Sequence, residues 1–240
     1  MLNDIKPEDI LFLDIETVPQ YAEYAQLPDT LKKLWEKKAA TLVKNTETPE
    51  NIYGRAGIYA EFGKIICISV GFIVSKNEGR FFRVKSFYGD NENLLLAEFG
   101  QMLSRFGKRA SANLCAHNGK EFDFPYIARR MLVNGIEIPE MLNVAGKKPW
   151  EVKFLDTMEL WKFGDNKHYT SLNLLTSIFN ISSPKDDIDG SQVADCYYSQ
   201  GDIERIVTYC EKDVLAVAQL LLKFIGQPLI NPNNIEHTAS

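Results

Sequence analysis

The stretch LFLDIET, at residues 11–17, places the strongest constraint on how this chain folds. Residues 10–17 form an apolar run that is interrupted by Asp14 and Glu16, which predicts a buried strand. Alternate residues of a strand point to the same face, so we expect the side chains of Asp14 and Glu16 to converge. Two carboxylates on one face of a buried strand repel each other and lose hydration, and a positive charge is needed to balance them.

The remaining apolar runs predict a sheet covered by helices. Residues 64–75 and 80–88 are separated by a turn at Asn77-Glu78-Gly79 and predict a hairpin. Further strands are expected at residues 111–117 and 154–157, and helices at residues 91–106, 124–134 and 202–224. A hairpin followed by alternating helices and strands predicts an α/β fold with a central, mixed, five-stranded sheet flanked by α-helices.

The length of 240 residues is typical of one domain with insertions or of two small domains. We expect a single domain at residues 1–228, with an insertion at residues 19–62 after the first strand. This insertion contains a segment with helical spacing, LPDTLKKLWEKKAATLV, followed by a loop-like segment. The polar residues 229–240 are expected to form a loose C-terminal tail.

Composition excludes several classes of protein. The net charge of −5, from 27 Lys and Arg against 32 Asp and Glu, argues against a protein that coats nucleic acid by bulk electrostatics, although it permits a nucleic-acid enzyme. No apolar run approaches the roughly 20 residues that span a bilayer, and the N-terminus lacks the apolar core of a signal peptide. The four cysteines lie far apart and are expected to be reduced. These features predict a cytoplasmic protein without a membrane partner.

Three separate segments place acidic residues where packing does not require them. The first contains Asp14 and Glu16, and the second contains Asp123, which follows a predicted strand and a short loop. The third contains Asp213, four residues after Tyr209 and therefore on the same face of the last helix. Four carboxylates from three elements can form an oxygen-rich cage for Mg²⁺ or Mn²⁺. Two such ions can clamp the attacking and leaving oxygens of a displacement at phosphorus.

The order of these motifs resembles the DEDD superfamily of 3′→5′ exonucleases, which have the ribonuclease H-like fold. The D-x-E-T motif of that family is matched at residues 14–17, and its Asn and aromatic-Asp motif is matched by Asn118 and Phe122-Asp123. The Y-x₃-D motif of the tyrosine (DEDDy) subclass is matched by Tyr209 and Asp213. The segment HNGKEFDFPYIARR is most similar to the proofreading exonuclease domain of family B DNA polymerases.

This resemblance implies a two-metal-ion site that holds two divalent cations, Mg²⁺ or Mn²⁺. In the family pattern, Asp14 bridges both metals, Glu16 and Asp213 complete the shell of one, and Asp123 serves the other. Tyr209 would orient the attacking water, because a phenol with a pKa near 10 is a weak base at neutral pH. Asp156 is assigned a supporting role, with hydrogen bonds to the backbone.

The implied substrate is the 3′ end of a single-stranded nucleic acid, which is hydrolysed to nucleoside 5′-monophosphates. The polymerase-like second motif favours DNA over RNA. The residues expected to contact the last nucleotides are Thr17, Asn118, Phe122 and Phe124. No polymerase sequence follows, so the resemblance implies an exonuclease that acts alone or as a subunit of an unidentified protein partner.

Each of these residues also has an ordinary structural explanation. Asp123 alone can cap a helix, Asp213 alone can be a surface acid, and Tyr209 alone can be core packing. One alternative function is a catalytically silent nucleic-acid-binding module with the same fold. Another is an aspartate-nucleophile phosphatase, for which Asp186-Asp187 would supply the later acidic pair.

Overall fold

The computed structural model describes residues 2–43, 47–165, 169–181 and 188–238. Within these residues six strands form one sheet in the order β5-β4-β1-β2-β3-β6. Strands β1 and β2, and β2 and β3, are antiparallel, whereas the pairs β1–β4, β4–β5 and β3–β6 are parallel. The strands are β1 Ile10–Pro19, β2 Gly63–Lys76, β3 Gly79–Tyr88, β4 Asn113–Ala116, β5 Leu155–Asp156 and β6 Ile235–His237.

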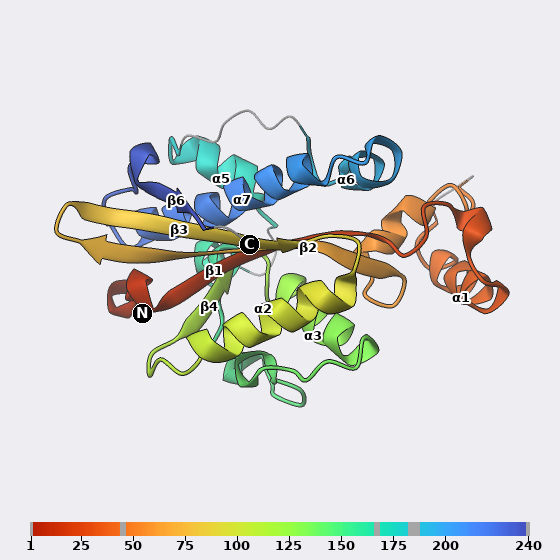
Figure 1. Ribbon diagram of the computed structural model, residues 1–240, viewed down its shortest axis with the longest axis horizontal. Helices are drawn as coiled ribbons and strands as arrows, with labels where there is room; N and C mark the ends of the chain where they lie inside the picture. The colour runs from red at the N-terminus through yellow and green to blue at the C-terminus, as the bar shows by residue number, and fades with distance from the viewer. Residues whose placement is uncertain (1, 44–46, 166–168, 182–187, 239–240) are drawn as a thin grey trace.

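Helices cover both faces of this sheet, with α5, α6 and α7 on one side and α2 and α3 on the other (Figure 1). The α-helices are α1 Asp29–Ala39, α2 Glu92–Phe106, α3 Asp123–Val133, α4 Thr157–Lys162, α5 Leu172–Ile178, α6 Val193–Asp195 and α7 Ile203–Phe224. Short 3-10 helices are η1 Leu2–Asp4, η2 Pro7–Asp9, η3 Tyr24–Gln26, η4 Tyr53–Ile58, η5 Glu140–Leu142, η6 Pro149–Glu151 and η8 Pro232–Asn234, and η7 Cys196–Gln200 is a π-helix. The expected α/β fold with a mixed, helix-flanked sheet is confirmed.

Strand β1 lies inside the sheet and is covered on both faces, as its apolar run predicts. Leu11, Leu13 and Ile15 belong to the core cluster under α2 and α3. Ile10 and Phe12 belong to the cluster packed against α7. Because side chains alternate along a strand, Asp14 and Glu16 continue the face that looks toward α7.

The sheet has one strand more than the expected five, because part of the predicted loose tail pairs with it. Strand β6 lies parallel to β3, with Ile235 opposite Phe82. The backbone N–H of Thr238 donates to the carbonyl of Val84 at 2.9 Å, which extends this pairing. A strand at the edge of a sheet presents unpaired backbone groups, and the polar tail satisfies those of β3.

The insertion after β1 folds around a small core of its own. Trp35 of α1 is fully buried and its indole Nε1–H donates to the carbonyl of Pro49 at 2.8 Å. Tyr53 and Phe62 make edge-on contacts with the Trp35 ring. Figure 1 shows α1 at one end of the molecule, and η4 brings the chain back to the end of β1.

In the described part of the chain, none of the helices is both long enough and apolar enough to cross a membrane. The four cysteines are free thiols in the structure, as their spacing predicts.

Candidate functional site

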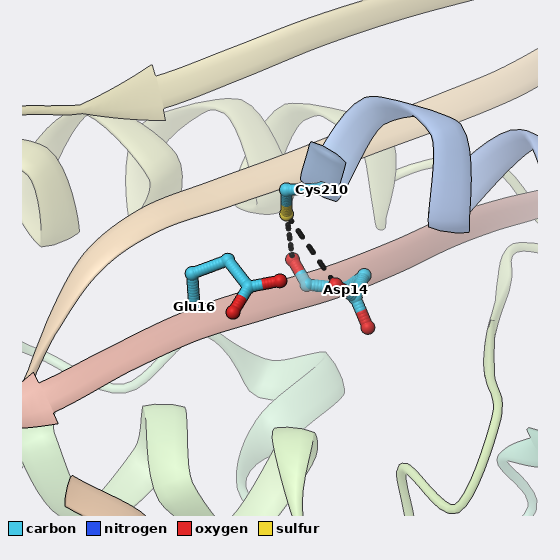
Figure 2. A group of neighbouring side chains, drawn as sticks. All are labelled: Asp14, Glu16 and Cys210. Carbon is cyan, nitrogen blue, oxygen red and sulfur yellow. Dashed lines mark hydrogen bonds between the residues drawn. The ribbon is translucent and has the colours of Figure 1, made fainter. Parts of the chain in front are cut away.

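Strand β1 carries the centre of the site. Asp14 and Glu16 lie on the face toward α7, and the register with β2 shifts between Glu16 and Thr17. One ligand atom from each of Asp14, Glu16 and Cys210 lies within 4.8 Å of the others (Figure 2). Figure 2 shows the Glu16 carboxylate turned toward Asp14, with the Cys210 thiol above both. The predicted convergence of the two carboxylates is therefore present.

Helix α3 supplies the third carboxylate. Asp123 is the first residue of α3, so the N-cap position belongs to Phe122. The Asp123 side chain is buried, with only 3% of the residue exposed. Its Oδ1 accepts a hydrogen bond from the backbone N–H of Ile15 at 3.2 Å. Ile15 lies between Asp14 and Glu16 in sequence, so this bond holds Asp123 against the same segment of β1.

Helix α7 supplies the remaining groups. Tyr209 and Asp213 are four residues apart and their side chains are hydrogen-bonded. The Cys210 thiol lies 3.4 Å from both the carbonyl oxygen and Oδ2 of Asp14, and joins α7 to β1. Sequence reasoning missed Cys210, although its position three residues before Asp213 places it on the same helical face.

The carboxylates perturb one another's proton affinity. The pKa of Asp14 is raised well above its usual value, first by burial and then by repulsion from Asp123, Glu16 and Asp213. Burial likewise raises the pKa of Glu16, and the charges of Asp213 and Asp123 add to the shift. Burial raises the pKa of Asp123 to about 7, against the hydrogen bond from Ile15. The cluster therefore holds more negative charge than the surrounding protein stabilises.

The phenol of Tyr209 is shifted in the direction that keeps it neutral. Burial raises its pKa above the usual value of 10, and the charges of Asp213, Glu16 and Asp14 raise it further. A neutral phenol can donate a hydrogen bond to a water molecule or a carboxylate. This arrangement suits a group that orients a reactant and does not suit a group that removes its proton.

The donor set fits a hard divalent cation. Among the described residues, no lysine or arginine forms an ion pair with Asp14, Glu16 or Asp123. Carboxylate oxygens are the ligands that Mg²⁺ and Mn²⁺ prefer, and a cation would lower the pKa values that burial raises. The residues that could hold it are Asp14, Glu16, Asp123 and Asp213.

Asp156 acts as a support, in agreement with its predicted role. Its carboxylate accepts hydrogen bonds from the backbone N–H groups of Asn118 at 2.9 Å and Lys120 at 3.1 Å. Asn118 has a positive φ of 62°, a conformation that these bonds help to hold. The Asn118 Oδ1 atom is buried and has no hydrogen-bond partner in the described residues, so it is available to accept a bond from a ligand.

The expected substrate-contacting residues divide into two groups. Thr17 and Phe122 are half-buried beside the carboxylates, and Thr17 is hydrogen-bonded to Tyr126. Phe124, in contrast, is 2% exposed and packs on Phe154 with ring centroids 4.4 Å apart. The prediction that Phe124 contacts substrate is therefore wrong for this structure, because the first turn of α3 directs that ring into the core.

Comparison with solved structures identifies the class of fold. The chain is similar to the family B DNA polymerase from the hyperthermophilic archaeon Pyrobaculum calidifontis, with a TM-score of 0.53. The match covers 90% of this chain but only 25% of the polymerase chain, at 16% sequence identity. At this identity the likeness supports a shared fold.

Comparison with family profiles is more specific. Residues 58–227 match a family described as a predicted 3′-5′ exonuclease related to the exonuclease domain of PolB. This match covers more than half of the chain, and the protein belongs to that family. The resemblance to the exonuclease domain of family B DNA polymerases is thereby confirmed. The matched region includes Asp123, Tyr209 and Asp213, whereas Asp14 and Glu16 precede it.

Proposed function

We propose that the protein is a metal-dependent 3′→5′ exonuclease that removes nucleoside 5′-monophosphates from the 3′ end of single-stranded nucleic acid, with DNA preferred. The observation that carries this proposal is the convergence of four mutually repelling carboxylates from β1, α3 and α7. Membership in a family of exonuclease-like domains supports the same reaction.

The four carboxylates would hold two Mg²⁺ or Mn²⁺ ions. When bound, such ions supply Lewis acidity that makes hydroxide available near neutral pH and stabilises a departing oxygen. Asp14 lies beside Glu16 on β1, and the charges of Asp123, Glu16 and Asp213 all raise its pKa. This position suits the bridging role that the motif pattern assigns to it.

The other side chains would orient the reactants. The neutral Tyr209 phenol can donate a hydrogen bond to the attacking water, while its link to Asp213 limits its rotation. The Asn118 Oδ1 atom can accept a bond from the terminal nucleotide. Thr17 and Phe122 would contact the same nucleotide by hydrogen bonding and stacking, and stacking contributes about 1–3 kcal/mol per base. Free, widely spaced cysteines favour a cytoplasmic location.

Digestion of end-labelled oligonucleotides tests the proposal. Single-stranded DNA, a duplex with a mispaired 3′ end and RNA are incubated in parallel with Mg²⁺ or Mn²⁺. We expect release of 5′-monophosphates from the 3′ end, fastest from single-stranded DNA, and loss of that release in Asp213→Asn. Asp29→Asn, at an exposed position on α1, is the matched control and should keep full activity. Equal release by wild type and Asp213→Asn would overturn the assignment.

The two alternative functions give different results in this assay. A silent nucleic-acid-binding module would bind the single strand without any hydrolysis during long incubation. A phosphatase would hydrolyse a small aryl phosphate and retain this activity in Asp123→Ala. The pair Asp186-Asp187, which the phosphatase hypothesis needs, lies outside the described residues, so the structure adds no support for it.

A further inference from the structure

A cavity of about 540 Å³ opens directly beside Glu16. Its floor is the end of β1, where Glu16, Thr17 and Pro19 line it. The volume is within the range of roughly 300–1,000 Å³ that is typical of small-ligand sites and is sufficient for a nucleotide. We refer to it as the β1 pocket.

One wall of the β1 pocket comes from the insertion. Arg55 and Ile58 of η4 line it, and both side chains are exposed. Phe122 and the segment at residues 190–194 line the remaining sides. Ile58 and Phe122 supply apolar surface, whereas Arg55 is the single basic residue among the described residues that line the pocket.

The η4 wall is fixed to the helix that carries Asp123. The Tyr126 hydroxyl donates to the carbonyl of Gly57 at 2.7 Å, and Arg130 Nη1 donates to the carbonyl of Ala60 at 2.8 Å. Arg130 is itself held by a buried ion pair with Glu92 at 2.6 Å. Arg130 is therefore a structural residue, and the position of Arg55 relative to the carboxylates is set by rigid elements.

Among the described residues that line the β1 pocket, Arg55 supplies the positive charge. Arg55 is exposed and forms no ion pair among the described residues, and the other charged residue that the structure places in the lining is Glu16. An arginine fork matches two phosphate oxygens, and it would attract a polyanion toward a pocket whose floor is acidic. The family match begins at residue 58, so Arg55 lies outside it.

We infer that the insertion completes the 3′-end pocket, and that Arg55 binds a backbone phosphate within the last few linkages of the single strand. Ile58 and Phe122 then form the apolar surfaces against which the terminal nucleotide packs. This inference rests on the proposed exonuclease function, because it names the residues that seat the same substrate. In this role Arg55 increases the affinity for a single strand of any base sequence and takes no part in the chemical step.

Binding of a fluorescent single-stranded oligonucleotide tests the inference without turnover. The measurement is fluorescence anisotropy with Ca²⁺ replacing the active metal, for wild type, Arg55→Ala, Arg55→Lys and Arg109→Ala. We expect Arg55→Ala to bind the oligonucleotide roughly tenfold more weakly. The slope of log affinity against log salt concentration should fall by the amount expected for the loss of about one phosphate contact. Arg55→Lys should recover part of the loss. Arg109, an exposed arginine between α2 and β4, is the matched control and should bind like wild type.

Neutral linkages then locate the contact. Oligonucleotides with a single methylphosphonate at each of the last four linkages are compared in wild type and Arg55→Ala. At one of these linkages, the methylphosphonate should weaken binding by wild type but not weaken binding by Arg55→Ala any further, because the two changes remove the same contact. In Mg²⁺, Arg55→Ala should raise KM and leave kcat within about twofold of wild type.

The outcomes separate this inference from the proposed function. If wild type binds and digests DNA but Arg55→Ala keeps the same affinity and salt slope, the role of Arg55 is wrong and the exonuclease assignment stands. If wild type neither binds nor digests any single strand, the exonuclease assignment itself fails. Equal melting temperatures of wild type and Arg55→Ala establish that a loss of affinity does not come from unfolding.

Discussion

Tyr209 illustrates how the site modifies a single residue. Its phenol is partly buried, and its hydroxyl is hydrogen-bonded to Asp213. The negative charges of Asp213, Glu16 and Asp14 act on it as well. Each of these features favours the protonated form. A tyrosine in this position can direct a hydrogen bond but is poorly placed to accept a proton at neutral pH.

Replacement of Tyr209 by phenylalanine tests this role. We expect Tyr209→Phe to lower kcat by on the order of 10–100-fold with little change in KM, because it removes an orienting hydrogen bond. The raised pKa means that the phenol does not titrate between pH 6 and about 9, so the shape of the pH–rate profile should be the same in both proteins. A limb of the profile that disappears in Tyr209→Phe would indicate that the tyrosine is a base.

At the scale of elements, the structure depends on the close approach of η4, β2 and α3. A Cβ atom on Gly63, at the start of β2, would lie 2.2 Å from the Tyr126 hydroxyl and 2.6 Å from the carbonyl of Gly57. Only a glycine lets these three segments meet. The contact that holds the wall of the β1 pocket therefore depends on the absence of one side chain.

The variant Gly63→Ala should destabilise the protein by about 1–3 kcal/mol, because the backbone of Gly57 and the Tyr126 hydroxyl that is hydrogen-bonded to it cannot both move aside freely. Chemical denaturation measures the loss. Gly54→Ala is the matched control, because a Cβ on Gly54 meets nothing within 4 Å. A Gly63→Ala protein as stable as Gly54→Ala would contradict the proposed role of this contact.

At the scale of the whole molecule, we expect the acidic cluster to couple folding to pH and, if the proposed function holds, to metal binding. In the folded, metal-free chain the pKa of Asp123 is raised from 3.8 to about 7, and those of Asp14 and Glu16 are raised too. The folded state thus holds these protons more tightly than the unfolded state does. The resulting stability is present at acidic pH and is lost as the pH rises through the folded-state pKa.

Stability measurements with a chelator should reveal this coupling. Relative to wild type, Asp123→Asn should gain on the order of 2 kcal/mol of unfolding free energy between pH 4.5 and 7.5, because the amide cannot ionise. Addition of Mn²⁺ should stabilise wild type more than Asp123→Asn and reduce the gap. If the difference in unfolding free energy between the two proteins does not change with pH, the pKa of Asp123 is not raised in the folded protein.

Local patterns in the sequence were sufficient to predict most of the fold and to single out the four carboxylates of the candidate site. The burial of β1 follows from its apolar run. Helix α2 begins at Glu92, directly after Asn91, whose side chain caps it by accepting a hydrogen bond from the backbone N–H of Leu94. Asp14, Glu16, Asp123 and Asp213 were predicted as site residues because acidic side chains interrupt or border apolar elements, in the order of a known set of motifs. Periodicity of this kind depends on neighbouring residues and is therefore readable from the sequence.

Contacts between distant segments were not readable in this way. The pairing of β6 with β3, the burial of Phe124 and the proximity of Cys210 to Asp14 each join residues whose separation no local pattern encodes. The same is true of Arg55, which lines the β1 pocket on a segment that Tyr126 and Arg130 fasten to α3. The apolar and acidic residues thus specify a buried strand with an unbalanced charge at its end, while long-range packing specifies which side chains surround that charge.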